Sequence, residues 1–285
     1  MSIVVTGATG TLGRLVIDQL LATVPAEQVV AVVRDQAKAA DLAARGVELR
    51  IADYTKPETL AEAFQAGDNV LLISSNTVGQ RVAQHAAVIS AAQAAGVARL
   101  AYTGILGGPA ADFQLAAEHK ATEQAILDSG LTYTFLRNGW YTENYTAQIP
   151  VQLEHGVVGS TGEGRIGSAT REDFAAAAVA VLLGEGHENK AYELSGDEAW
   201  TLAEYAAELS KQSGKEIAYA DVPPEALKGI LLGAGLPEPF AEILVDVDTA
   251  GISRGLLAGG NGDLSRLIGR PTTPLTDTIA LALKG

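Results

Sequence analysis

Cysteine is absent from the 285-residue chain, and methionine occurs once. The missing thiols exclude disulfide bonds, thiolate nucleophiles and cysteine metal sites, although they leave the compartment undecided. Basic residues are also scarce, with 20 lysines and arginines against 34 aspartates and glutamates, so the net charge is −14. Such a charge repels phosphate backbones and anionic lipid headgroups. We therefore expect neither a nucleic-acid nor a membrane partner.

Long apolar runs are missing too, since no stretch of the sequence reaches the length of a membrane span. No signal peptide precedes the first predicted strand, which favours a cytoplasmic protein. The composition is that of a folded protein, because hydrophobic residues make up 47% of the chain. A chain of this length can bury a full core, as one large domain or as one domain with a smaller lobe.

A glycine-rich turn near the start of the sequence is the most informative stretch. The β-branched run Ile3–Val5 is typical of a buried parallel strand, and Gly7, Gly10 and Gly13 follow it before an amphipathic helix. Strand, glycine turn and helix together form the setting of a dinucleotide site, in which free N–H groups at the helix start hold the pyrophosphate. The spacing G-x-x-G-x-x-G differs from the usual fingerprint, so a plain glycine turn is the alternative.

Arg34 directly follows the second predicted strand, Val29–Val33, at the position that meets the adenosine ribose in such folds. An acidic residue there would bind the 2′-OH of NADH, whereas an arginine accommodates the 2′-phosphate of NADPH. Arg34 therefore predicts NADPH as the cofactor, while the neighbouring Asp35 keeps NADH open.

Further strands alternate with helices along the first half of the chain, which predicts a Rossmann-type, doubly wound parallel α/β sheet. The polar loop Ser74, Ser75, Asn76 and Thr77 follows the fourth strand. Because ligands bind at the carboxyl ends of such strands, we expect this loop to contact the cofactor, with an ordinary turn as the alternative. The expected strands are 47–51, 69–73, 97–102 and 131–136, and the expected helices are 37–45, one beginning with a capping box at 55–58, 80–95 and 112–129.

We place an NAD(P)-binding domain at residues 1–150, with a strand and a helix returning from about 165–195. A smaller α+β substrate lobe occupies residues 151–285. In this half, Thr201–Glu204 predicts a capping box with Trp200 packed beside it, and residues 227–248 predict two helices broken at 235–237. Arg171 lies at the start of another helix, where it either caps the turn at the surface or faces the ligand crevice.

The catalytic pair of ordinary short-chain dehydrogenases is missing. Those enzymes place a tyrosine four residues before a lysine on one helical face, and the lysine lowers the phenol pKa for proton transfer. Lys120 stands at a plausible place, but Ala116 occupies the tyrosine position, and Thr103 lies where the serine would be. Thr103 and Lys120 are therefore weak catalytic candidates, and Lys120 is more simply a solvated helix lysine. His85, alone inside a predicted helix, is interpreted as a surface or packing residue.

The motifs TGATGTLG, VVRD, ADY, LLISS, AAGVARLAYTG, EHKATE and TFLRNGWYTENY together resemble the NmrA-like family of atypical short-chain dehydrogenases. The similarity is greatest to its bacterial NAD(P)H:quinone oxidoreductases and triphenylmethane reductases, and it extends over nearly the whole chain. The resemblance implies NADPH as the hydride donor, and we expect neither a metal nor a flavin. Lys120 departs from the pattern, since close relatives are apolar there. The implied cofactor contacts are Gly7, Ala8, Thr9, Gly10, Thr11, Leu12, Arg34, Asp53 (at the adenine), Ser75–Thr77, Gly139, Trp140, Tyr141, Thr142, Glu143 and Asn144.

A quinone acceptor explains why the tyrosine can be absent, because the reduced product is a delocalised anion that takes its proton from water. Trp140 and Tyr141 are expected to wall or stack on the acceptor, with core packing as the alternative. Asn138, Asn144 and Thr103 are candidate donors to a quinone oxygen. The prediction is thus an NADPH-dependent reductase of quinones or of planar azo or triphenylmethane dyes.

Two other functions are compatible with parts of the sequence. The main alternative is a non-catalytic NAD(P)-sensing regulator of the NmrA type, which needs no acceptor site. An isomerase or epimerase of the extended short-chain group is disfavoured by Ala116 in place of a tyrosine. The sequence is also compatible with a homodimer.

Overall fold

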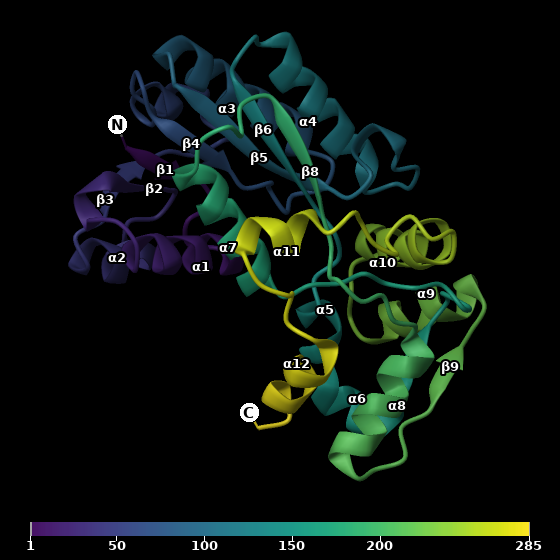
Figure 1. Cartoon of the computed structure of the whole chain (residues 1–285). Coiled ribbons are helices and arrows are strands. Elements are labelled where there is room, and N and C mark those ends of the chain that lie inside the picture. The colour runs from purple at the N-terminus through teal and green to yellow at the C-terminus, as the bar shows by residue number, and fades with distance from the viewer. Residues whose placement is uncertain (1, 285) are drawn as a thin grey trace. The chain divides into compact units, whose positions relative to one another are not determined.

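The computed structural model, which describes residues 2–284, contains a seven-stranded sheet in the order β3-β2-β1-β4-β5-β6-β8 (Figure 1). Every pairing from β3 across to β6 is parallel. The predicted Rossmann-type fold is therefore confirmed. The strands are β1 (Ile3–Val5), β2 (Val29–Val33), β3 (Glu48–Ile51), β4 (Asn69–Leu72), β5 (Arg99–Ile105), β6 (Tyr133–Asn138) and β8 (Lys190–Leu194).

The order of the strands reverses between β1 and β4, which lie side by side with Val5 opposite Leu71. The N–H of Thr6 continues this pairing by donating to the carbonyl of Leu71 at 3.0 Å. The segments that leave the two strands therefore emerge next to each other. In open α/β sheets this switch point is where ligands bind.

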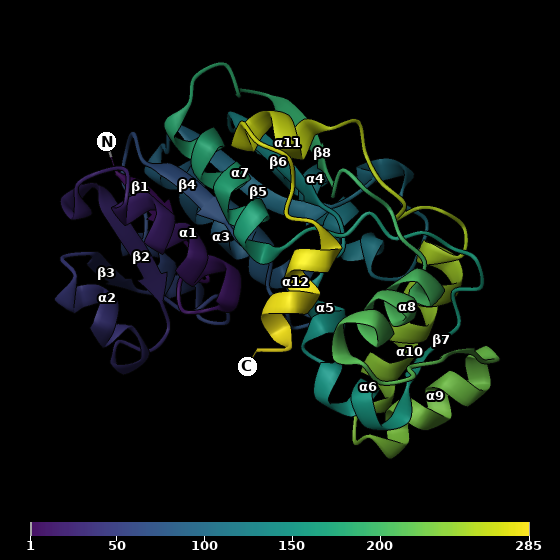
Figure 2. The ribbon, with the colours of Figure 1, turned by 60° about the horizontal axis from the view of Figure 1, so that its bottom comes forward.

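Four helices cover the two faces of the sheet within this part of the chain. Helices α1 (Thr11–Leu21) and α7 (Arg171–Leu183) pack together on one face, and α3 (Arg81–Ala95) and α4 (Ala116–Asp128) lie on the other (Figures 1 and 2). Residues of α3 and α4 share one buried apolar cluster with β1, β2, β4 and β5. This cluster holds α3 and α4 against the sheet. From these positions the two helices reach the carboxyl ends of the strands.

The capping box predicted at residues 55–58 is wrong. The hydroxyl of Thr55 donates to Asp53 Oδ1 at 2.8 Å and accepts no amide at the start of the following helix. The segment that follows is a 3-10 helix, η3 (Pro57–Glu62), without a side-chain cap. The helix predicted at 37–45 is also split, into a 3-10 turn, η2 (Ala37–Ala39), and a short α2 (Ala40–Ala44).

The boundaries around the fifth strand differ from prediction as well. Strand β5 extends to Ile105, so Thr103 lies inside the strand and does not open a loop. The cause is the partner strand β6, which itself continues to Asn138 and pairs Leu136 with Thr103. Helix α4 begins at Ala116 and not at 112, since residues 113–115 form a bend and a turn after the 3-10 turn η4 (Gly108–Ala110).

The chain forms two compact units that are interleaved in the sequence. The first unit contains the residues up to Ile105, Glu118–Asn138 and Arg171–Tyr192; the second contains Leu106–Ala117, Gly139–Thr170 and the residues from Glu193 onward. Within residues 2–284, no helix has the length and apolar character needed to cross a bilayer. The elements of the second unit are α5 (Glu143–Thr146), α6 (Ile149–His155), β7 (Val157–Gly159), α8 (Leu202–Ser213), β9 (Tyr219–Asp221), α9 (Pro224–Gly233), α10 (Glu238–Asp246), a π-helix (Val247–Ile252), α11 (Asp263–Ile268) and α12 (Leu275–Ala282).

Two predictions for this half are confirmed. The capping box at the start of α8 is formed, with the amide of Glu204 donating to Thr201 Oγ1 at 3.1 Å and the amide of Thr201 donating to Glu204 Oε2 at 2.9 Å. Trp200 packs beside it as a buried side chain. The predicted break between two helices lies between α9 and α10.

Asp248, in the π-helix of the second unit, is a carboxyl group held in a poorly hydrated place. Its Oδ2 accepts a hydrogen bond from the amide of Ser160 at 2.9 Å. Burial raises the pKa of Asp248 to about 6; the Ser160 amide opposes this shift, and the negative charge of Asp221 adds to it. Because its folded-state pKa lies above the ordinary value, ionisation of this group destabilises the fold as the pH rises from about 4 to about 6.

We expect Asp248→Asn to remove this pH dependence. The variant should gain up to about 3 kcal/mol over the wild type between pH 4 and pH 7, because the amide mimics the protonated carboxyl and cannot ionise. Urea unfolding at several pH values measures the difference. Asp41→Asn is the control, since Arg14 holds the pKa of Asp41 low by a hydrogen bond and the sign should reverse. A difference that does not vary with pH would contradict the expectation.

Candidate functional site

The predicted glycine turn joins β1 to α1 with its backbone folded back on itself. Gly7 has φ of +61°, and the amide of Gly10 donates to its carbonyl at 2.9 Å. Helix α1 begins at Thr11, and no side chain caps it at Gly10. The first amides of the helix are therefore left without a side-chain acceptor, as a phosphate-binding helix start requires.

Gly13 allows helix α1 to lie directly on this turn. A Cβ at Gly13 would stand 2.8 Å from the Cα of Ala8, and closer still to the carbonyl oxygen of Gly7. Ala8 and Leu12 are buried, whereas Gly10 and Thr11 are exposed. The turn thus presents backbone at its surface and has no room for a side chain beneath it. This arrangement fits a dinucleotide pyrophosphate.

Tyr54 is a residue of this region that sequence reasoning missed. Its buried hydroxyl lies beside Thr6 and Gly7 without reaching hydrogen-bond geometry with any of the described residues. Burial raises the pKa of Tyr54 to about 12, and the proximity of Thr6, Arg34 and Gly7 opposes the shift. An aromatic residue three positions after the third strand, next to the predicted adenine contact Asp53, was the available signal. A buried hydroxyl that needs a partner is consistent with a ligand at this turn.

Arg34 lies exposed at the end of β2 and forms no ion pair with the residues that the structure describes. Its acidic neighbours are engaged elsewhere. Asp35 Oδ1 accepts the amide of Ala37 at 2.9 Å, and Asp53 Oδ1 accepts the amide of Thr55 at 3.0 Å. The bonds from Thr55 lower the pKa of Asp53, to which the charge of Arg34 contributes. The guanidinium is therefore open to an anion, as the 2′-phosphate role requires.

The loop after β4 is held by side chains at three successive amides. The amide of Ile73 donates to Thr6 Oγ1 at 3.2 Å, that of Ser74 to Thr103 Oγ1 at 2.9 Å, and that of Ser75 to His85 Nε2 at 3.0 Å. The amides of residues 73–75 are consequently occupied within the protein. Thr103 is buried, and its hydroxyl accepts the Ser74 amide, which favours a role in holding the loop over proton transfer.

The other candidates of the first unit lie at separate points. Asn138 ends β6 as a buried residue, and its Oδ1 has no hydrogen-bond partner among residues 2–284. Lys120 is a partly exposed residue of α4, and the fully buried Ala116 lies one turn before it. Arg171 begins α7 and is partly exposed. No phenol therefore stands where a Tyr–Lys pair would need one.

In the second unit, the segment Gly139–Asn144 is fixed by its backbone. The amide of Gly139 donates to the carbonyl of Leu194 at 2.6 Å. Ala169 bonds on both sides, donating to Trp140 at 3.1 Å and accepting the amide of Thr142 at 3.0 Å. The buried Thr142 hydroxyl also bonds Ser168 at 2.8 Å. These hydrogen bonds hold the backbone of the segment in place from Gly139 to Thr142.

Trp140 and Tyr141 of this segment are both partly exposed. The Trp140 side chain lies near the phenol of Tyr145, whose pKa burial raises above its ordinary value. Tyr145 packs edge-on against Trp200, with ring centroids 5.0 Å apart. Contact of Trp140 or Tyr141 with an acceptor stays a prediction.

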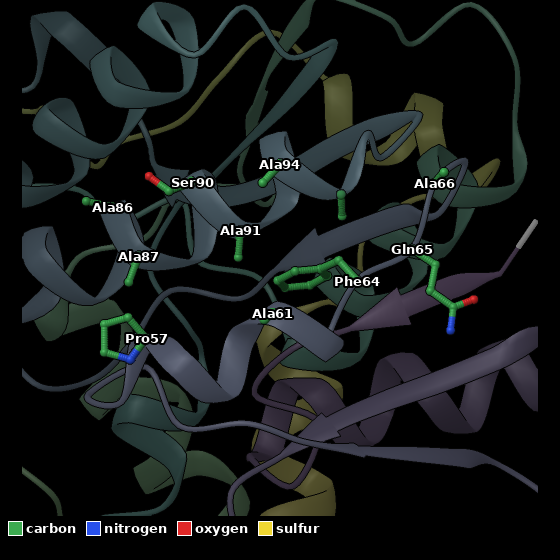
Figure 3. Close-up of a pocket in the computed structure, with 11 residues that line it drawn as sticks. Pro57, Ala61, Phe64, Gln65, Ala66, Ala86, Ala87, Ser90, Ala91 and Ala94 are labelled. Carbon is green, nitrogen blue, oxygen red and sulfur yellow. The ribbon is translucent and has the colours of Figure 1, made fainter.

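A shallow hollow of about 810 Å³ lies elsewhere on the first unit, between η3 and α3 (Figure 3). Pro57 stands at one end, Gln65 at the other and the Phe64 ring between them, and most other lining residues are alanines. Phe64 and Gln65 precede β4, whereas the polar loop follows that strand. Ligand sites combine an apolar wall with converging polar groups, which this hollow lacks. We do not assign the cofactor to it.

Comparison with known proteins identifies the family. A family described as NAD(P)H-binding matches residues 7–185, from the glycine turn to the end of α7. The chain belongs to this NAD(P)H-binding family. It is 51% identical to quinone oxidoreductase 2 of Escherichia coli strain K12, with 98% of this chain and 97% of that protein covered. The structure of the E. coli NADPH-dependent quinone oxidoreductase complexed with NADPH has 50% sequence identity and a TM-score of 0.96, covering 99% of each chain.

Two further members of the group are similar over most of their length. The triphenylmethane reductase of Citrobacter sp. is 44% identical with a TM-score of 0.94, and all of both chains is covered. The NAD(P)H azoreductase of Xenophilus azovorans is 34% identical over 94% of this chain and 93% of that protein. The predicted resemblance to NmrA-like quinone oxidoreductases and triphenylmethane reductases is confirmed.

Separately, the described residues contain no cluster of three or more acidic or histidine side chains that could hold a metal ion.

The glycine turn yields a direct test. Gly13→Ala should destabilise the protein by about 2 to 4 kcal/mol, because its Cβ would collide with the backbone of residues 7 and 8. It should also weaken NADPH binding at least tenfold, since α1 must move away from the turn. Gly229→Ala, in α9 with open space around its Cβ, is the matched control and should stabilise slightly. Equal behaviour of the two variants would contradict the packing argument.

Proposed function

We propose that this protein is an NADPH-dependent oxidoreductase that reduces quinones and similar planar conjugated acceptors, azo and triphenylmethane dyes among them. The observation that carries the proposal is the 51% identity to E. coli quinone oxidoreductase 2 over nearly the full length of both proteins. The azoreductase and the triphenylmethane reductase among the relatives support acceptors that are flat and conjugated.

The residues of the first unit fit the parts of NADPH in a definite way. The uncapped amides at the start of α1 would hold the pyrophosphate, and the free guanidinium of Arg34 would fork onto the 2′-phosphate. The loop 74–77 would meet the sugar on the nicotinamide side, because it leaves the strand next to the glycine turn. Asp53 and Tyr54 would border the adenine end.

When bound, NADPH supplies a hydride, and quinone, hydride and one proton together give the hydroquinone. No tyrosine precedes Lys120 at the spacing of the usual acid, so the proton comes from water. What this chain contributes is orientation of two flat partners and exclusion of solvent around them. Trp140 and Tyr141 are the proposed acceptor contacts, with Asn138, Asn144 and Arg171 as polar candidates.

Steady-state oxidation of NADPH and of NADH with a panel of benzoquinones, naphthoquinones and dyes tests the proposal. Turnover that saturates in the acceptor, with NADPH preferred, is the expected result. Tight NADPH binding without turnover on any acceptor would overturn it and would favour a dinucleotide-sensing regulator.

Reversal of the charge at residue 34 tests the cofactor preference. Arg34→Glu should raise the KM for NADPH about a hundredfold and leave that for NADH within about threefold, because only NADPH carries the 2′-phosphate. Arg45→Glu serves as the control, since it reverses the same charge at a different place. Arg45 lies at the end of α2, where it forms an ion pair with Asp18. An equal rise for both cofactors in Arg34→Glu would contradict the assigned role.

Removal of the lysine amine tests whether this chain donates the proton. Lys120→Ala should keep quinone reduction within about threefold of wild type at all pH values, because water supplies the proton. A loss greater than roughly a hundredfold, the scale of a general acid, would make Lys120 the donor. Stopped-flow measurement with saturating NADPH separates this effect from weaker cofactor binding.

A further inference from the structure

Three side chains from the start of α3 hold Ser75, in the middle of the loop after β4. Its amide donates to His85 Nε2 at 3.0 Å, and its carbonyl accepts from Arg81 Nε at 2.7 Å. Its hydroxyl donates to Gln84 Oε1 at 2.6 Å and accepts the amide of Thr77 at 3.2 Å. Every polar atom of Ser75 therefore has a partner, and three of the four bonds come from a single helix.

The hydrogen bonds around His85 determine its tautomer. Because Nε2 accepts the Ser75 amide, the ring proton must lie on Nδ1, which donates to Thr122 Oγ1 at 2.9 Å. The Thr122 hydroxyl then donates to the carbonyl of Glu118 at 2.8 Å. A directed chain of hydrogen bonds thus runs from the loop through α3 to the backbone of α4.

The ring is also kept neutral. His85 is fully buried, and burial together with the positive charge of Arg81 lowers its pKa to about 3. A protonated ring would carry a donor on Nε2 and would face the Ser75 amide with a second N–H. The imidazole is therefore neutral, and an acceptor toward the loop, at pH values well above 3.

His119 is a neighbour with the same character and a different target. It is a buried residue of α4, and its Nδ1 bonds the hydroxyl of Tyr102 at 2.7 Å. Burial lowers its pKa as well. It makes no hydrogen bond to the loop 73–80 among the described residues. Substitution of His119 therefore shows the effect of disturbing the buried layer alone, whereas substitution of His85 also releases the loop.

We propose that His85 is a positioning residue for dinucleotide binding, whose Nδ1-protonated ring holds Ser75 and thereby the loop 74–77 in the form that receives the nicotinamide ribose. The inference rests on the proposed function, because the fold assigns this loop to the cofactor. His85 itself does not touch NADPH. Its loss would leave the Ser75 amide without an acceptor in a partly buried place, and the loop would move to find one.

The test compares NADPH dissociation constants, measured by equilibrium titration without an acceptor, in three variants. His85→Leu removes the acceptor and should weaken NADPH binding about tenfold or more. His85→Gln keeps an oxygen near the Nε2 position and should restore binding to within about threefold. His119→Leu is the control, which should lower the melting temperature comparably and leave NADPH affinity unchanged.

Thr122→Val provides a second, milder variant in case His85→Leu does not fold. It keeps the side-chain volume but leaves the buried Nδ1–H without an acceptor, so it should weaken NADPH binding several-fold and lower the melting temperature less than His85→Leu does. Equal affinity losses in His85→Leu and His119→Leu, or no loss in His85→Leu and Thr122→Val, would overturn the inference. Because binding is measured without an acceptor, a wild type that binds NADPH but reduces no quinone refutes the proposed function and leaves this test intact.

Discussion

The parallel pairing of β1 with β4 is the constraint on which the candidate site depends. It places the glycine turn and the loop after β4 side by side, and Thr6 joins them directly. The amide of Thr6 bonds the carbonyl of Leu71, and its hydroxyl accepts the amide of Ile73. The glycine turn and the loop after β4 are therefore held together by hydrogen bonds within the protein itself. Such preorganisation lowers the entropic cost of binding.

The chemistry proposed for this protein matches the groups that these two segments offer to a ligand. The uncapped backbone amides at the start of α1 and the exposed guanidinium of Arg34 suit the phosphates, and the polar loop after β4 suits a sugar. Nothing in this arrangement resembles a Tyr–Lys acid, and the position of that tyrosine is a buried alanine. An acceptor that needs only a hydride and a proton from water agrees with that absence. Binding geometry, and not proton transfer, is then the contribution of the chain.

The features that the sequence predicts well are those set by neighbouring residues. The strand, glycine turn and start of α1 follow from β-branched residues and from glycines that a close approach demands. The capping box at Thr201 forms with an α-helix, in which the amide of Glu204 reaches the Thr201 hydroxyl. At Thr55 the same sequence pattern fails, since the segment that follows is a 3-10 helix that begins after Lys56, and the Thr55 hydroxyl donates to Asp53.

What the sequence does not predict depends on partners distant in the chain. Thr103 lies inside β5 because β6 continues to Asn138, and this pairing has no local signal. Tyr54 reaches Gly7 through the fold alone. His85 is a packing residue, as interpreted, but its bond to Ser75 joins a helix to a loop ten residues earlier. The two interleaved units likewise arise from contacts that composition does not reveal.

The most direct test of the account is the pH dependence of hydride transfer itself. The rate of a single turnover, with bound NADPH and excess benzoquinone, would be followed from about pH 5 to about pH 9, with 4-deuterated NADPH to verify that hydride transfer is observed. The account predicts a primary isotope effect and a rate that changes less than about twofold, because no acid of the protein takes part. A rate that falls tenfold per pH unit on the alkaline side would show that a protein group donates the proton and would contradict the account.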